Sequence, residues 1–290
     1  TDYQVRIPAE DLEVYSKTRS LEITDTSFPP NNNTLIAWVK LPKLDSTKDT
    51  SIYMYYGNPN GNEINDKDTW DNNYLMIQHF SETPNNTTNG FLDSTSYLNH
   101  GTPEGFKNTA ESNTRLEGLI DGAITLGDTE NVVVVQNNQE LNNLNKFTFS
   151  AWIKPKSDVS TETRTLLVKP LDDWQEPFYL YSFDINQGML GLGISDGTTR
   201  EYLAGGTIVS EVWQHIAGVY DGNSLKLYIN GNLDANQTIS TLVGENTNNL
   251  LIGNALQTDT DFIGYLDEFR ISKTNRSNNW IKTEFLNQSN

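Results

Sequence analysis

A long series of short strand-like segments, from about Leu119 to Ser272, is the feature that most constrains the fold. The segments are rich in β-branched and aromatic residues and recur every ~8–15 residues, with Gly, Asn or Asp between them. Because no helical segments alternate with them, we predict antiparallel pairing. The expected fold is all-β, an antiparallel β-sandwich of the jelly-roll type over residues 74–290.

Two turn signals predict hairpins within this region. The stretches "YDGNS" (Tyr220–Ser224) and "INGN" (Ile229–Asn232) contain Asp-Gly and Asn-Gly pairs, which supply positive φ angles in tight turns. We therefore expect Val212–Tyr220 and Leu225–Ile229 to form a hairpin. A single helical pattern occurs at Ser277–Gln288, where Trp280, Ile281 and Phe285 would lie on one side.

Residues 1–73 contain strand-like runs of their own, at Tyr3–Ile7, Thr34–Leu41 and Thr50–Gly57. About 70 residues form a marginal core alone. We expect this N-terminal module to be rich in β-structure and to pack on the main domain. The chain begins at Thr1 without Met, so we expect a processed or excised product.

Composition excludes several classes of protein. The net charge is −18, from 38 acidic against 20 basic residues, so a nucleic-acid partner is not expected. The absence of Cys excludes disulfides, thiol catalysis and zinc-thiolate sites. No apolar run approaches the roughly 20 residues of a membrane-spanning helix.

Three stretches resemble the laminin-G-like, or concanavalin A-like, jelly-roll family. They are "FTFSAWIKP" (Phe147–Pro155), "WQHIAGVYDGNSLKLYINGN" (Trp213–Asn232) and "IGYLDEFRISKTNRS" (Ile263–Ser277). Residues 34–73 also resemble the end of a domain of unknown function that is common in secreted surface proteins. The resemblance implies a module at the cell surface or outside the cell.

The same resemblance implies a structural calcium ion at the rim of the sandwich. Asp93, which opens "DSTSYLNHGT" (Asp93–Thr102), and Asp267 match the family positions, and Asn99 and Gly101 could add oxygen ligands. The alternative interpretation of these residues is an Asx turn at Asp93 and a strand-end salt bridge at Asp267.

Catalytic patterns are not met. A glycoside hydrolase of this fold needs paired carboxylates, but Tyr265 occupies the leading Glu position of the laminarinase-like motif, and the adjacent Asp267 and Glu268 should face opposite sides of a strand. No G-x-S-x-G elbow accompanies the histidines, and His79 and His215 fit strand positions. We predict no catalytic site.

Carbohydrate recognition needs exposed aromatic rings beside polar groups. Trp174 beside Asp173 is the aromatic residue that we most expect to be exposed, and Tyr179 follows it. The sequence thus predicts a non-catalytic extracellular recognition module that binds carbohydrate or another surface ligand. The alternatives are a structural subunit of a surface layer, filament or adhesin, with other protein chains as partners, or an accessory domain of a larger polysaccharide-degrading enzyme.

Overall fold

A computed structural model gives the fold for most of the chain. It describes residues 3–7, 18–20, 23–24, 34–35, 38–41, 50–54, 67–106, 118–120, 122–127, 131–142, 144–156, 161–171, 179–255 and 260–289. Among these residues, no helix is long and apolar enough to cross a membrane.

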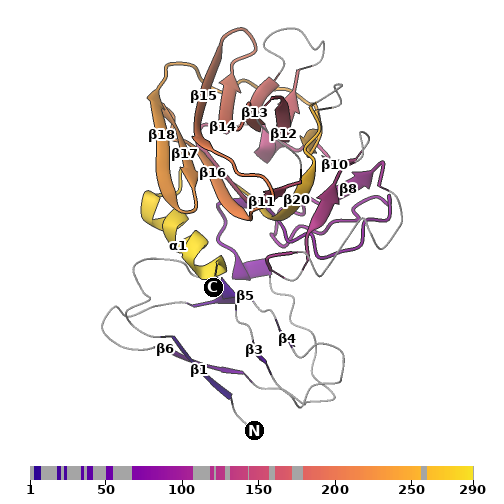
Figure 1. Cartoon of the computed structure of the whole chain (residues 1–290), viewed down its shortest axis with the longest axis vertical. Coiled ribbons are helices and arrows are strands. Elements are labelled where there is room, and N and C mark those ends of the chain that lie inside the picture. The colour runs from indigo at the N-terminus through magenta and orange to yellow at the C-terminus, as the bar shows by residue number, and fades with distance from the viewer. Residues whose placement is uncertain are drawn as a thin grey trace.

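Two antiparallel sheets pack face to face as a sandwich, which confirms the predicted fold class (Figure 1). The first sheet has the strand order β15-β14-β13-β12-β19-β10-β8, and the second has the order β18-β17-β16-β11-β20-β7, with β9 also paired to β20. The strands of the first sheet, in chain order, are β8 (Gly101–Glu104), β10 (Val132–Val135), β12 (Thr163–Pro170), β13 (Tyr179–Asn186), β14 (Met189–Ser195), β15 (Arg200–Thr207) and β19 (Leu250–Ile252). Those of the second are β7 (Tyr74–Gln78), β9 (Ile124–Leu126), β11 (Phe147–Pro155), β16 (Gln214–Tyr220), β17 (Ser224–Ile229), β18 (Asn232–Thr238) and β20 (Gly264–Ser272).

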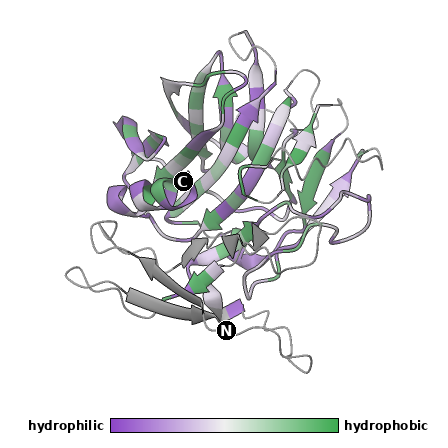
Figure 2. Ribbon diagram, turned by 60° about the horizontal axis from the view of Figure 1, so that its bottom comes forward, coloured by the Kyte–Doolittle hydropathy of each residue, from purple (hydrophilic) through white to green (hydrophobic). Residues whose placement is uncertain are grey.

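Alternating side chains from both sheets form one apolar core between them. Phe149 of β11 contacts Phe183 of β13, with ring centroids 6.2 Å apart, and both are fully buried. Because successive side chains point to opposite faces of a strand, every second residue enters this core and the rest face outward. Figure 2 shows the resulting bands of apolar and polar residues along the strands.

The predicted hairpin and helix are both present. β16 pairs with β17 through the turn in which Gly222 has a φ of +96°, the conformation that the Asp-Gly signal predicted. Helix α1 (Asn278–Gln288) begins after Ser277, whose hydroxyl accepts the Trp280 N–H. Its Ile281 packs on the outer face of the second sheet. Two short 3₁₀ helices lie at Lys67–Thr69 and Gln139–Leu141.

The described N-terminal strands form three small antiparallel pairs. β1 (Tyr3–Ile7) pairs with β6 (Thr50–Met54), β2 (Thr18–Ser20) with β5 (Trp38–Lys40), and β3 (Ile23–Thr24) with β4 (Thr34–Leu35). Two of the predicted strand regions thus coincide with β1 and β6. Within the third, Thr34–Leu41, residues 36–37 lie outside the described residues.

Trp38 joins this N-terminal region to the sandwich. Its ring stacks on His79, with centroids 5.4 Å apart, and lies 4.9 Å from the guanidinium carbon of Arg270. Trp70 completes the cluster, 5.3 Å from Trp38. Trp38 thus contacts the sandwich, while the packing of residues 1–73 as a module and the boundary at residue 73 stay predictions.

Candidate functional site

A pocket on the outer face of the first sheet is the candidate functional site. Its volume is about 270 Å³. Side chains of β12, β13 and β15, together with residues of the segments around 255 and 260, form its walls. The lining residues are Thr163, Thr165, Val168, Tyr179, Ser182, Asp184, Asn186, Arg200, Tyr202, Ala255 and Thr260.

Strand β13 supplies the polar floor through strict alternation. Tyr181, Phe183 and Ile185 point into the core and are fully buried. The intervening residues therefore face the pocket, and they are Ser182, Asp184 and Asn186. The sequence "YSFDIN" thus places three hydrogen-bonding side chains in a row on one face of the sheet.

Two glycines in the neighbouring strand β14 make room for the tyrosines. Gly193 and Gly191 lie opposite Ser182 and Asp184 across the β13–β14 pair. A Cβ atom on Gly191 would overlap the Tyr202 hydroxyl, and one on Gly193 would overlap the ring and hydroxyl of Tyr179. Since only glycine leaves this space, the Tyr202 side chain of β15 reaches across β14 to Asp184 of β13. The Tyr179 ring extends from β13 over Gly193 of β14.

Asp184 is the buried charged group of the pocket. Its side chain accepts hydrogen bonds from the Tyr202 hydroxyl at 2.6 Å and from the Ser182 hydroxyl at 3.2 Å. Burial raises the pKa of Asp184 to about 6, although these two hydrogen bonds and the charge of Arg200 act in the opposite direction. Burial and the neighbouring Asp184 charge also raise the pKa of Tyr202, which therefore stays a hydroxyl donor.

This arrangement is suited to a small polyhydroxylated ligand. Asp184 and Asn186 offer oxygen acceptors, Arg200 offers guanidinium donors, and the tyrosine rings offer apolar faces. A sugar ring has both hydroxyl groups and apolar C–H faces. The volume of the pocket lies just below the usual range of volumes for small-molecule sites. This size fits one sugar residue better than a long chain.

Of the predicted ligand-binding residues, Tyr179 lies in this pocket. Asp173 and Trp174 lie outside the described residues, so their roles stay predictions. Four lining residues were not among those expected from the sequence, namely Ser182, Asp184, Asn186 and Arg200. The strict polar–apolar alternation of "YSFDIN" was the available signal, since it indicates a strand with one solvent-facing polar side.

Both carboxylate oxygens of the predicted calcium ligand Asp93 accept hydrogen bonds, from its own loop and from strand β7. Its Oδ1 accepts the N–H groups of Ile77 and Thr95 at 2.9 and 3.0 Å. Its Oδ2 accepts the Thr95 hydroxyl at 2.7 Å and the Asn99 N–H at 2.8 Å. The contact with Thr95 N–H is an Asx turn, which is the alternative interpretation of this residue.

The other predicted ligands are also engaged. The main-chain oxygen of Asn99 accepts from the Gln78 amide at 3.1 Å, and that of Gly101 accepts from Phe91 N–H at 2.9 Å. Asp267 Oδ2 accepts the N–H groups of Leu119 and Ile120, both at 2.9 Å, whereas its Oδ1 is buried without a hydrogen-bond partner among the described residues. Most of these oxygen atoms accept hydrogen bonds from N–H or hydroxyl groups of the chain, which fits a hydrogen-bonded structure better than a calcium coordination shell. Calcium binding stays a prediction.

The adjacent acids Asp267 and Glu268 do not follow the expected alternation. Glu268 has a φ of +52°, and the β11–β20 register shifts between Ser150 and Trp152, which marks a bulge. Burial, followed by the nearby Glu268 charge, raises the pKa of Asp267 well above its usual value. The expectation of opposite faces was therefore wrong, because it assumed a regular strand. Both side chains are buried.

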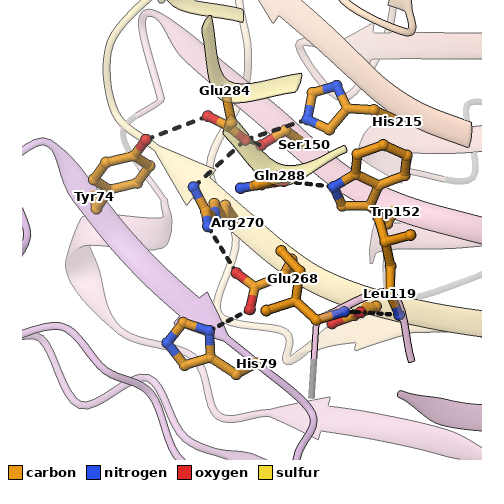
Figure 3. A network of polar contacts seen from close by, with 12 residues as sticks. Tyr74, His79, Leu119, Ser150, Trp152, His215, Glu268, Arg270, Glu284 and Gln288 are labelled. Carbon is orange, nitrogen blue, oxygen red and sulfur yellow. Dashed lines mark hydrogen bonds and ion pairs between the residues drawn. The ribbon is translucent and has the colours of Figure 1, made fainter. Parts of the chain in front are cut away.

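A buried polar network lies under α1, on the outer face of the second sheet (Figure 3). Arg270 contacts Glu268 at 2.7 Å and Glu284 at 3.7 Å. His79 contacts Glu268 at 2.6 Å, and His215 contacts Glu284 at 3.4 Å. Burial alone would raise the pKa of Glu284, but Arg270, His215 and Ser150 hold it at about 2. His79 and His215 thus have structural partners. His215 lies in β16, as predicted, whereas His79 directly follows the end of β7.

Comparisons with known proteins identify two regions of the chain. Residues 126–282 match the concanavalin A-like lectin/glucanases superfamily, and residues 8–92 match a domain of unknown function, DUF2341. A search of curated proteins finds no match.

Solved structures share the fold at low sequence identity. The receptor-binding domain of botulinum neurotoxin C/D mosaic serotype is 16% identical, with a TM-score of 0.58 over 74% of this chain and 51% of that one. The binding domain of Paraclostridial Mosquitocidal Protein 1 is 18% identical, with a TM-score of 0.56 over 76% and 52%. The chain thus matches about half the length of these structures. Because the superfamily match at residues 126–282 covers more than half of the 290 residues, the protein belongs to the concanavalin A-like lectin/glucanases superfamily, in its laminin-G-like branch.

Proposed function

We propose that this protein is a non-catalytic extracellular recognition module that binds carbohydrate in the pocket of the first sheet. The observation that carries the proposal is the buried Asp184, which accepts hydrogen bonds from Tyr202 and Ser182 in a pocket that Tyr179 also lines. A binding role also agrees with the similar solved structures, which are described as receptor-binding or binding domains.

The buried Asp184 carboxylate makes the empty pocket energetically unfavourable. Burying a carboxylate costs free energy unless a partner compensates it, and the raised pKa of Asp184 reflects that cost. Hydrogen bonds donated by sugar hydroxyl groups to the Asp184 carboxylate would supply the missing stabilisation. The ring C–H face of the sugar would then pack against Tyr179 or Tyr202, whose amphipathic rings suit such contacts.

A glycan array followed by calorimetry tests this proposal. We expect reproducible binding to a defined set of glycans. Because a hydrogen bond to a charged group contributes about 1.5–3 kcal/mol, Asp184→Ala should weaken binding roughly 10- to 100-fold. Glu104→Gln, which removes one exposed negative charge outside the pocket, should leave the affinity unchanged.

Two further variants separate the pocket from the residues predicted by sequence alone. Tyr202→Ala should weaken binding if the ligand occupies the pocket, and Trp174→Ala tests the neighbouring segment. Binding that resists both Asp184→Ala and Tyr202→Ala would contradict this site. Assembly that rises with concentration in light scattering, without glycan binding, would support the structural-subunit alternative instead.

A further inference from the structure

Lys169 is a buried lysine with an unusual environment. It lies on β12, opposite the core residue Tyr181, and its exposed fraction is 0%. Lysine is almost never fully buried without a charged partner. Here the amine donates to two neutral oxygens, Asn137 Oδ1 at 2.6 Å and the main-chain oxygen of Asn248 at 2.7 Å.

This environment disfavours the charged form of the amine. None of the ion pairs between described residues includes Lys169. Desolvation lowers the pKa of its amine to about 8. About one amine in ten is then neutral at pH 7, and a neutral amine has the lone pair that a nucleophile needs.

The geometry places this amine beside an amide carbon. Since a C=O bond is about 1.23 Å long, the Asn137 Cγ lies within about 3.8 Å of Lys169 Nζ. Reacting atoms in near-attack geometry are about 3–3.5 Å apart. Both partners are held in place, because Asn248 anchors the amine and the Asn137 N–H donates to Asn249 Oδ1 at 3.1 Å.

We propose that Lys169 and Asn137 join in an intramolecular isopeptide bond. The lone pair of the neutral Nζ attacks Asn137 Cγ, the Cγ–Nδ2 bond breaks, and ammonia leaves with one proton taken from Nζ. One amine and one carboxamide thus give one secondary amide and one ammonia, with no oxidant or other reactant. The reaction replaces a buried cation with a neutral amide, which removes the desolvation cost of the ammonium group.

The bond would covalently link the segment after β10 to β12 in the middle of the first sheet. Asn137 follows β10, and Lys169 lies near the end of β12, while β19 runs between these two strands. The link would therefore span three adjacent strands and close a covalent loop from 137 to 169. Such a loop restricts the unfolded chain in the same way as a disulfide, in a protein that has no Cys.

Intact-protein mass spectrometry of the purified full chain tests the proposal directly. The expected mass is lower than the sequence mass by one ammonia, about 17 Da. A digest analysed by tandem mass spectrometry should contain a branched peptide that joins the segment with Asn137 to the segment with Lys169. The full unmodified mass would overturn the proposal.

Two variants distinguish this bond from succinimide formation at an asparagine, which also releases ammonia. Lys169→Arg should restore the full mass, because arginine lacks the nucleophilic amine. Lys226→Arg, a matched control at a partly exposed lysine paired with Asp221, should keep the mass loss. A mass loss that persists in Lys169→Arg would assign the ammonia to another asparagine and overturn the inference.

Discussion

The replacement Asp184→Asn should make the protein more stable at neutral pH. The pKa of Asp184 is about 6 in the folded chain against an ordinary value of 3.8, and one unit corresponds to about 1.4 kcal/mol, so the charge costs the folded state about 3 kcal/mol above pH 6. Because the folded state binds this proton more tightly than the unfolded state, stability falls as the pH rises from about 4 through 6. Asparagine removes this dependence while it keeps an acceptor for Tyr202.

Urea unfolding of both proteins at pH 4.5 and pH 8 measures the effect. The gain in the free energy of unfolding on replacing Asp184 with Asn should be about 2 kcal/mol larger at pH 8 than at pH 4.5. This value follows from integrating the proton linkage with the folded and unfolded pKa values of Asp184. Glu104→Gln controls for the loss of one negative charge. An Asp184→Asn difference that is equal at the two pH values would refute the argument that burial of this carboxyl destabilises the empty pocket.

Three other predictions concern the pocket, the buried network and the rim. Gly191→Ala should displace the Tyr202 hydroxyl and weaken glycan binding in calorimetry, whereas Gly127→Ala, where the nearest atom lies 4.0 Å from the new Cβ, should not. Arg270→Met removes the buried guanidinium that contacts both Glu268 and Glu284 and should cost about 3–5 kcal/mol in urea unfolding, against less than about 1 kcal/mol for Lys226→Met at a partly exposed pair. If calcium binds at the site predicted from the sequence, added calcium should give a higher melting temperature than a chelator does. An unchanged melting temperature would exclude a stabilising ion.

The fold was accessible from the sequence because its signals are local. Positive φ angles at Gly222 and Gly231 follow from the Asp-Gly and Asn-Gly turns, and they fix the β16–β17 and β17–β18 hairpins. The Ser277 cap likewise marks the start of helix α1, although the buried residues of this helix are mostly polar (Ile281, Thr283, Glu284 and Gln288). Each signal operates over a few residues, so the order of strands and turns can be derived without knowledge of long-range contacts.

The bulge at Glu268 shows where local reasoning fails. Regular alternation would separate Glu268 from Asp267, but a left-handed residue in β20 changes the register against β11. In this conformation the Glu268 carboxylate contacts Arg270 and His79. His79 is 189 residues away in the chain, so no window of sequence could contain this interaction.

The sequence by itself determined the sandwich, its hairpins and the terminal helix, because periodicity and turn chemistry act between near neighbours. Only the tertiary structure decided which polar side chains gather into a site. The pocket brings Asp184, Tyr202 and Thr260 together from separate segments, and its room depends on two glycines in a fourth. Tertiary packing also placed Lys169 beside Asn137 and the Ile77 N–H of β7 beside the Asp93 carboxylate. These groupings depend on strand order and register, which set the distances between residues remote in sequence.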